Sequence, residues 1–171
     1  MSESLVLVDE KDREIGIEEK IKAHKEGKLH RAFSIFVFNS KGEMLITRRA
    51  KSKYHWSGFW SNACCSHPRP GEPLEKAAHR RLKEELGFDC GLKKAFDFIY
   101  KVKFENGLFE HEFDHVFIGK FDGKPSPDKE ETDGWKWIPL GELKKEIADS
   151  AKYTPWFQIM VKKMQEMRTL N

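Results

Sequence analysis

One amphipathic helix, predicted between two backbone signals, constrains the fold of this chain more than any other stretch. Pro73 suits the first helical position, where its missing N–H costs nothing, and Gly87 suits the position just past the last turn. Between them an apolar residue recurs every fourth position, which predicts a stripe that packs against a central sheet. The stripe consists of Leu74, Ala78, Leu82 and Leu86.

Reactive side chains lie at both ends of this helix. The thiol of Cys65 and the imidazole of His67 precede it, and the carboxylate of Glu85 lies in its last turn. Arg81 is four residues before Glu85, so these two side chains share a helical face beside the apolar stripe. The arrangement indicates a site for a metal ion and a phosphate group.

Apolar patterns predict a sheet around the helix. Residues 33–38 are nearly all apolar, which is typical of a strand covered on both faces, and residues 44–47 return as its hairpin partner. A chain of 171 residues forms one well-cored domain, and two would be cramped. The other predicted strands cover residues 5–8, 96–104 and 135–138, and the other predicted helices cover 17–25, 140–148 and a Trp and Met stripe from Trp156 to Met167 behind Thr154-Pro155.

Composition excludes several classes of function. The net charge of +3, with 35% charged residues, is near balance and does not predict a nucleic-acid partner. No apolar run approaches the ~20 residues of a membrane span, and no signal peptide opens the chain. Cys64, Cys65 and Cys90 are poor material for disulfides, so a cytoplasmic location is expected.

Two charged segments are ambiguous when each is taken alone. The basic run 48–53 is expected on a loop, where charge runs are usually solvated. Beside a metal and phosphate motif it becomes a diphosphate clamp, since arginine grips phosphate oxygens in a fork and lysine adds a point charge. Residues 130–133 are expected to form an exposed acidic loop.

Histidines and carboxylates elsewhere also allow two interpretations. His24 and His30 flank a break at Gly27, and each alone is more often a surface residue than a ligand. Glu110 and Glu112 lie two apart on a predicted strand, so both project from one face about 6.6 Å apart. They could face solvent, and Asp114 on the same face keeps that alternative open.

The helix and its loop resemble the Nudix box, in which a glycine, a glutamate and an Arg-Glu pair precede two further glutamates and a glycine. The matching positions are Ser66, Glu72, Arg80, Arg81, Leu82, Glu84, Glu85, Gly87 and Phe88. Ser66 replaces the first glycine and Arg81 replaces the first glutamate of the pair. The second change removes a metal carboxylate that Nudix pyrophosphohydrolases use, and so argues against that reaction.

The run Cys65-Ser66-His67-Pro68 resembles a narrower group, the type I isopentenyl diphosphate isomerases, and the resemblance extends over nearly the whole chain. Cys65 is preferred to its neighbour Cys64 because the motif counts a cysteine, one residue, then a histidine. The resemblance implies a Nudix-like α/β fold, a mixed-sheet α/β/α sandwich, as a single domain over residues 1–171. A monomer that acts on a small molecule is expected.

The resemblance also implies a set of site residues. Three imidazoles and two carboxylates would hold Mn²⁺, Zn²⁺ or Mg²⁺, and Glu85 would hold a second Mg²⁺ through the diphosphate of the substrate. The first metal set is His24, His30, His67, Glu110 and Glu112. The expected substrate-binding residues are Lys20, Arg49, Lys53, Arg81 and Trp156.

The reaction implied is a 1,3-allylic proton transfer that converts isopentenyl diphosphate into dimethylallyl diphosphate through a tertiary carbocation. It needs an acid and a base on opposite faces of a dry pocket, and Cys65 and Glu112 match that pair. In the family Glu112 is usually placed on the protonating side, with Tyr100 hydrogen-bonded to it. Trp156 would stabilise the cation with its ring face. The alternatives are a Nudix pyrophosphohydrolase and a non-catalytic metal-binding module.

The turn at Asn106-Gly107 tests this assignment. A two-residue type I′ loop would pair Tyr100 with Phe113 and point the tyrosine away from Glu112. A three-residue loop of residues 105–107, with Gly107 in the left-handed region, brings Tyr100 opposite Glu112. We predict the three-residue loop, because the catalytic assignment requires it.

Overall fold

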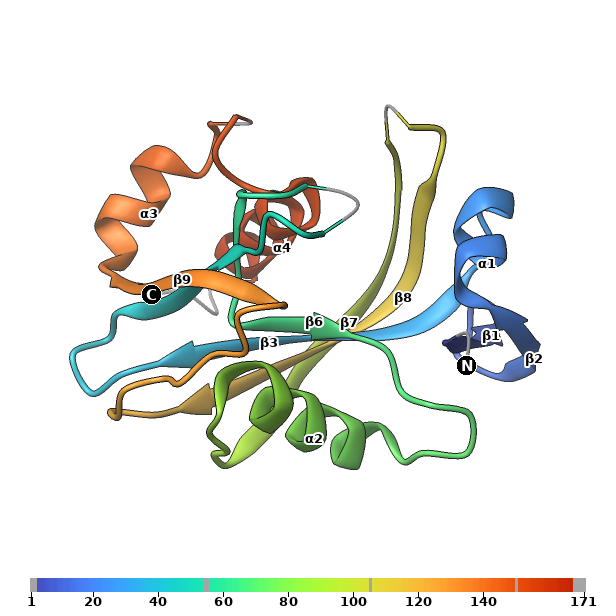
Figure 1. Ribbon diagram of the computed structural model, residues 1–171, viewed down its shortest axis with the longest axis horizontal. Coiled ribbons are helices and arrows are strands. Elements are labelled where there is room, and N and C mark those ends of the chain that lie inside the picture. Colours follow the sequence, from blue (N-terminus) through green and yellow to red (C-terminus); the bar gives the residue numbers. More distant parts are fainter. Residues whose placement is uncertain (1–2, 54–55, 105, 150, 168–171) are drawn as a thin grey trace.

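The computed structural model describes residues 3–53, 56–104, 106–149 and 151–167 (Figure 1). One strongly curled mixed sheet forms the centre, and four helices surround it. In chain order the elements are β1 (Ser4–Val8), β2 (Glu14–Glu19), α1 (Lys20–Glu26), β3 (His30–Phe38), β4 (Met44–Arg49), β5 (Trp60–Ser61), β6 (Cys64–Ser66), α2 (Leu74–Leu86), β7 (Leu92–Lys103), β8 (Phe109–Lys120), β9 (Thr132–Ile138), α3 (Leu140–Glu146) and α4 (Pro155–Glu166). The predicted single α/β domain with a mixed sheet is confirmed.

The parallel pair of β3 and β8 is the centre of the sheet. Its register places His30 beside Glu112 and Ala32 beside Asp114. β3 also pairs with β1, β4 and β6, while β7 follows β8 and β9 follows β4. Every residue of β3 from Ala32 to Val37 is buried, as its continuous apolar pattern predicts.

Helix α2 covers one face of this sheet, below it in Figure 1. Ala78, Leu82 and Leu86 are fully buried in a cluster with residues of β3 and β4, so the predicted stripe is confirmed. Pro73 is the residue just before the helix, one position earlier than predicted, because its extended ψ of 134° does not fit a helical turn. Gly87 ends the helix in the left-handed region, where an added Cβ would lie 2.6 Å from the Ser126 carbonyl oxygen.

Helices α3 and α4 lie on the other side of the sheet, above it in Figure 1. Trp156, Met160 and Met164 of α4 are buried in the second apolar cluster, whereas Met167 is about half exposed and leaves the predicted stripe. Thr154 occupies the predicted N-cap position but makes no capping bond, because its hydroxyl donates to Ser61 instead.

Three sequence assignments are corrected. Residue 17 belongs to β2, where it pairs with Val6, so the helix predicted over 17–25 begins only at Lys20. The first two residues of the basic run, 48 and 49, belong to β4 and not to a loop. In the predicted acidic loop, residues 132 and 133 belong to β9, and Thr132 is buried.

The β7–β8 hairpin has the predicted register. Tyr100 pairs with Glu112, and Phe104 accepts a bond from Gly107 N and donates to Leu108 O. Gly107 has φ of 81°, which fits the predicted bulge. Glu105, the first residue of the predicted loop, lies outside the described residues. Because Tyr100 of β7 pairs directly with Glu112 of β8, the two side chains lie on the same face of the sheet.

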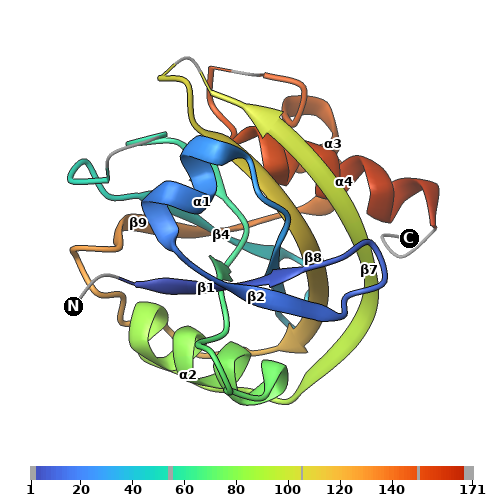
Figure 2. The same cartoon turned by 90° about the vertical axis from the view of Figure 1, so that its right-hand side faces the viewer.

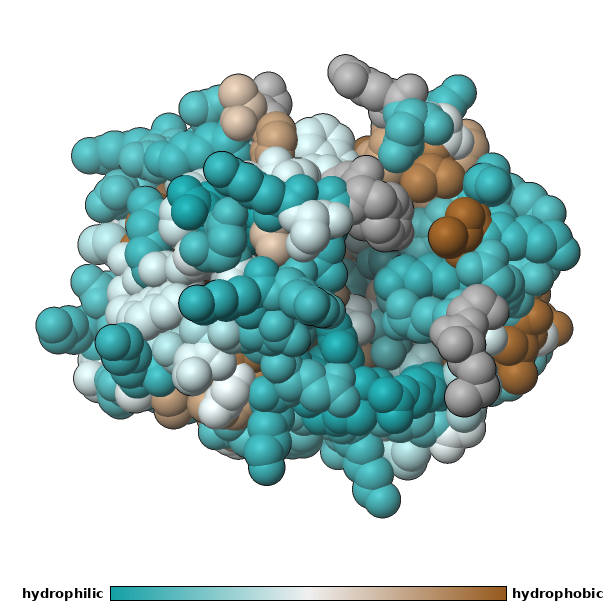
Figure 3. All heavy atoms as spheres, in the orientation of Figure 1, coloured by the Kyte–Doolittle hydropathy of each residue, from teal (hydrophilic) through white to brown (hydrophobic). Residues whose placement is uncertain are grey.

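The β1–β2 hairpin and α1 close one end of the sheet, with α1 above the hairpin and α2 below it in Figure 2. The surface shown in Figure 3 is mainly hydrophilic, with a small hydrophobic patch at its right-hand edge over the hairpin. Ile15 and Ile17 are exposed on β2, and Ile21 is exposed on α1. No helix in the described ranges is both long and apolar enough to cross a membrane.

Candidate active site

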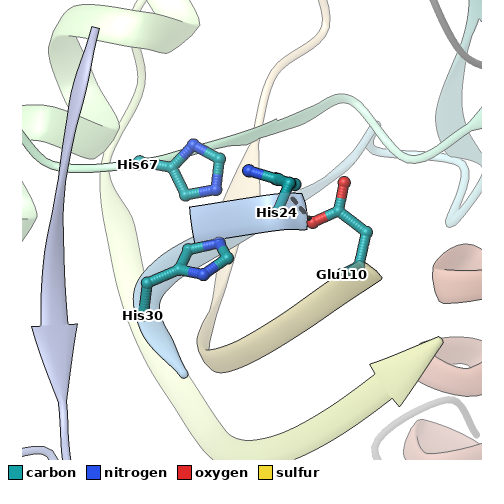
Figure 4. Close-up of side chains that lie close together, drawn as sticks. All are labelled: His24, His30, His67 and Glu110. Carbon is teal, nitrogen blue, oxygen red and sulfur yellow. Dashed lines mark ion pairs between the residues drawn. The ribbon is translucent and has the colours of Figure 1, made fainter. Parts of the chain in front are cut away.

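Three imidazoles and one carboxylate lie close together (Figure 4). His24 comes from α1, His30 from the start of β3, His67 from the loop after β6 and Glu110 from β8. One ligand atom of each lies within 4.8 Å of the others. His24 and His30 are 2% and 0% exposed, so neither is the surface histidine that isolated histidines usually are.

Backbone carbonyls orient two of these rings. His24 Nδ1 lies 2.7 Å from Lys20 O, and His30 Nδ1 lies 2.9 Å from Lys28 O. A carbonyl only accepts, so each Nδ1 carries a proton, and each Nε2 faces the centre of the cluster, where a neutral ring presents its lone pair. This is the orientation that metal-binding histidines adopt.

Buried polar atoms at the centre lack partners among the described residues. His24 Nε2 and His30 Nε2 make no hydrogen bond there, and His24 Nε2 lies 3.3 Å from Glu110 Oε2. Orphaned buried polar atoms are costly, and imidazole nitrogen with carboxylate oxygen suits Zn²⁺ or Mn²⁺. These residues therefore fit a divalent metal ion.

Glu112 completes the cluster and connects it to β7. One carboxylate oxygen lies 3.0 Å from His67 Nε2 and 3.6 Å from His30 Nε2, and the other accepts a 2.7 Å hydrogen bond from Tyr100 Oη. Glu110 and Glu112 are 6% and 7% exposed, which excludes the solvent-facing alternative.

Burial and the neighbouring charges separate the pKa values of these groups. Burial opposes ionisation of Glu112, but His30 and His67 hold its pKa well below the usual range. Burial and the charge of Glu112 raise the pKa of Glu110 to about 7. Burial lowers the pKa of His67 to about 4. Burial also disfavours the charged form of His24, yet the Glu110 carboxylate raises its pKa.

Cys65 lies on β6, opposite Ser34 of β3. Its Sγ is 3.0 Å from Asn62 Oδ1 and 3.4 Å from Ser34 Oγ, whose proton goes to Asp114. Burial raises the pKa of the Cys65 thiol, and Asp114 adds to the shift. Cys64 packs in the apolar cluster beneath α2, on the opposite face of the strand.

The predicted substrate-binding residues share the same cavity, and acidic side chains already contact several of them. Lys20 lies 2.7 Å from Glu3, and Lys53 contacts Glu131. Glu131 is partly buried and lines the cavity, so the expectation of an exposed acidic loop is wrong at this residue.

Arg81 extends from α2 towards the carboxylates of Glu85 and Glu131. Its Nη2 lies 2.6 Å from Glu85 and 3.2 Å from Glu131. Burial disfavours the charge on Glu85 and raises its pKa, against the pull of Arg81. The guanidinium therefore connects two carboxylates that face one cavity.

Arg49 and Trp156 also line the cavity and lie close to each other. The Arg49 guanidinium lies 5.2 Å from the centre of the Trp156 ring, a distance typical of a cation–π contact. The cavity has a volume of about 730 Å³. The predicted residues that line it are Cys65, Tyr100, Glu112, Glu110, His24, His67, Glu85, Lys20, Arg49, Lys53, Arg81 and Trp156.

Sequence reasoning missed several polar residues of the site, namely Ser34, Asn62 and Glu131. Ser34 and Asn62 lie in segments whose pattern indicates only strand or turn. The signal that could have been used is polarity inside an apolar strand, since Ser34 interrupts the run 33–38. Glu131 could not be identified, because its partners Lys53 and Arg81 are distant in sequence.

Comparisons with known proteins identify the family of this chain. Residues 28–157 match the NUDIX domain family. An Aromatoleum aromaticum protein named isopentenyl-diphosphate Delta-isomerase 2 is 49% identical, with 100% of this chain and 91% of the relative covered. A Photorhabdus laumondii protein of the same name is 52% identical, covering 94% and 92%. Both matches are nearly full length.

Solved structures show the same fold at low identity. The DR0079 protein of Deinococcus radiodurans has a TM-score of 0.79 at 22% identity, covering 94% of this chain and 98% of that one. A MutT protein from Methanosarcina mazei has a TM-score of 0.64 at 20% identity, covering 82% and 95%.

Proposed function

The chain belongs to the Nudix family and, within it, to the isopentenyl-diphosphate Delta-isomerases, and we propose that it isomerises isopentenyl diphosphate with Cys65 and Glu112 as the reacting pair. It is an isomerase of isoprenoid biosynthesis. One observation carries the function: several relatives of that name are 49–52% identical to this chain over nearly its full length.

The first metal ion would be held by His24, His30, His67, Glu110 and Glu112. The orphaned nitrogen atoms described above support this set. When bound, a divalent ion supplies positive charge that fixes the ligands and makes a proton on the neighbouring carboxyl group more acidic. Tyr100 and two imidazoles hold Glu112 at the cavity wall.

Cys65 and Glu112 would each exchange one proton with the substrate. One group delivers a proton to C4 of the alkene, the other removes a proton from C2, and the molecular formula is unchanged. Both side chains line one cavity and approach it from different strands, β6 and β8. Tyr100 would orient the Glu112 carboxyl group. Trp156 would face the cationic carbon with its ring, where the quadrupole stabilises positive charge.

The diphosphate would bind at the basic wall of the cavity. Arg49 and Arg81 each offer a planar fork of N–H donors to phosphate oxygens, and Lys53 offers a compact positive charge. Lys20 adds a fourth cation from α1. Glu85, with a second Mg²⁺, would hold the diphosphate from the α2 side, and the proximity of Arg81 supports that arrangement.

Proton exchange in D₂O tests the reaction and the acid–base pair together. The protein, loaded with Mn²⁺ and Mg²⁺, should convert isopentenyl diphosphate and introduce deuterium at C4. Cys65→Ala and Glu112→Gln should each reduce turnover at least 100-fold, because losing a general acid or base typically costs 10²–10⁴-fold. Cys90→Ala is the matched control, since Cys90 is a free cysteine away from the cavity lining.

Each remaining alternative has its own outcome in that experiment. Phosphate release from nucleotide substrates, without isomerisation, would establish a pyrophosphohydrolase. Metal binding with no turnover of either substrate would establish a non-catalytic module. Full activity in Cys65→Ala would remove Cys65 from the mechanism while leaving the family assignment intact.

The expected cytoplasmic location and the expected monomeric state are part of this proposal. Free thiols at all three cysteines support the cytoplasmic location expected from the sequence. The expected monomer is tested by light scattering of the metal-loaded protein.

A further inference from the structure

A buried hydrogen-bonded chain links Trp156 on one wall of the cavity to Cys65 on another. Its members are Trp156, Ser61, Asn62 and Cys65, and the first three are 4%, 5% and 1% exposed. Trp156 Nε1 lies 3.1 Å from Ser61 Oγ, Ser61 Oγ lies 3.0 Å from Asn62 Oδ1, and Cys65 Sγ lies 3.0 Å from the same oxygen.

The direction of each bond in this chain is determined by its chemistry. An indole N–H only donates, so Ser61 Oγ accepts from Trp156, and it also accepts from the Thr154 hydroxyl at 3.1 Å. The proton of Ser61 is then left to donate onward to Asn62.

The amide of Asn62 has only one possible orientation. Its Nδ2 donates to two backbone carbonyls, Ile35 O at 3.1 Å and Cys64 O at 2.9 Å. Exchanging the amide oxygen and nitrogen would place an oxygen against both carbonyls, so that orientation is excluded. Asn62 Oδ1 therefore faces Cys65 as an acceptor only.

We propose that Asn62 is the positioning residue of the reacting thiol: its fixed acceptor oxygen receives the Cys65 S–H and keeps the sulfur at one place in the cavity wall. Through Ser61 the same residue ties the thiol to the Trp156 ring. The two groups that would flank the reacting carbons are thus held in register by one buried amide. The proposal rests on the catalytic role given to Cys65 above.

A spectroscopic measurement tests the hydrogen bond without using activity. The S–H stretching band of Cys65 is isolated as the wild-type minus Cys65→Ala difference spectrum of the metal-loaded protein, since Cys64 and Cys90 also carry thiols. The band should lie at lower wavenumber than that of a free thiol and move up in Asn62→Ala. A missing band, or one at the free-thiol position in the wild type, overturns the proposal.

Kinetics test whether the contact matters for the reaction. Asn62→Ala should lower kcat about 10- to 100-fold, since small displacements of a reacting group cost that much, with KM within about threefold. Asn39→Ala is the matched control, because it removes the same amide group from a residue outside the cavity lining, where Asn39 bonds Glu43 at 2.7 Å. It should lose similar thermal stability and keep kcat within about threefold.

Equal kcat losses in the two variants would show that residue 62 acts only through folding and would overturn the proposal. If Asn62→Ala does not fold, the wild-type difference spectrum still decides. Full turnover by Cys65→Ala would remove the catalytic role of the thiol, whereas the band position would still report whether Asn62 holds it.

Discussion

Tyr100 Oη donates a 2.7 Å hydrogen bond to Glu112 Oε2, and the two residues face each other directly across the β7–β8 pair. The other oxygen of the carboxylate lies against His67 and His30. Glu112 is therefore held from both sides, by the Tyr100 phenol at one oxygen and by the imidazoles of His67 and His30 at the other. Its orientation in the cavity does not depend on solvent.

Tyr100→Phe should lower kcat about 10- to 100-fold, because a hydrogen bond to a charged group contributes roughly 1.5–3 kcal/mol and each 1.36 kcal/mol is tenfold in rate. Steady-state turnover of isopentenyl diphosphate measures the effect. Tyr153→Phe is the control, since that hydroxyl bonds Glu146, which is not among the residues lining the cavity. Equal losses in both variants would contradict a specific role for Tyr100.

Divalent metal should stabilise the fold. At a Mn²⁺ concentration 100 times its dissociation constant, the gain is about 2.7 kcal/mol, or roughly 5–10 °C in Tm for a chain of this size. Differential scanning fluorimetry with and without chelator measures it. His24→Ala should abolish the shift, and His79→Ala, at an exposed histidine paired with Asp89, should keep it.

The metal-dependent shift in Tm should shrink as the pH falls from 8 to 6. Burial and Glu112 raise the pKa of Glu110 to about 7, so the metal-free carboxyl group takes up a proton in this range. The metal must then displace that proton, which weakens its binding. A shift that is the same at both pH values would argue against Glu110 as a ligand.

Arg49→Ala should raise KM for isopentenyl diphosphate about tenfold with little change in kcat, as loss of a ground-state diphosphate contact does. The adjacent residue provides the control. Arg48 projects to the other face of β4, where its Nε lies 2.6 Å from Asp133, so Arg48→Ala should leave KM unchanged. Equal KM values for all three proteins would show that the basic segment does not touch the substrate.

Glu72 should stabilise the fold above about pH 4.5 and lose that contribution as the pH falls towards 2. Hydrogen bonds from Arg80 lower its pKa to about 2, below the ordinary value. A pKa that is lower in the folded than in the unfolded state means that the ionised carboxylate stabilises the fold, so protonation removes this stabilisation. Urea titrations should show Glu72→Gln below wild type at pH 6 and converging with it at pH 2, with Glu10→Gln, at an exposed site, unchanged throughout.

Much of the fold and site could be predicted because the deciding signals are local. Gly87 and the apolar stripe of α2 follow from helical geometry, and the hairpin register follows from Gly107 once Tyr100 is required opposite Glu112. The start of α1 could not be predicted, since residue 17 is placed by pairing with Val6. The proposed role of Asn62 could not be predicted either, because its amide is oriented by the backbone carbonyls of Ile35 and Cys64, which lie on two different strands.

The register of β3 against β8 determines when the metal site can form. His30 and Glu112 are neighbours in the sheet but 82 positions apart in the chain, and the two strands that carry them run parallel. Such distant pairing closes slowly, because the entropy of a long loop is lost before any contact is gained. A chain still being synthesised has both early histidines before either carboxylate exists. Binding of a metal ion to these residues would therefore be a late event in folding, after the central parallel pair has closed.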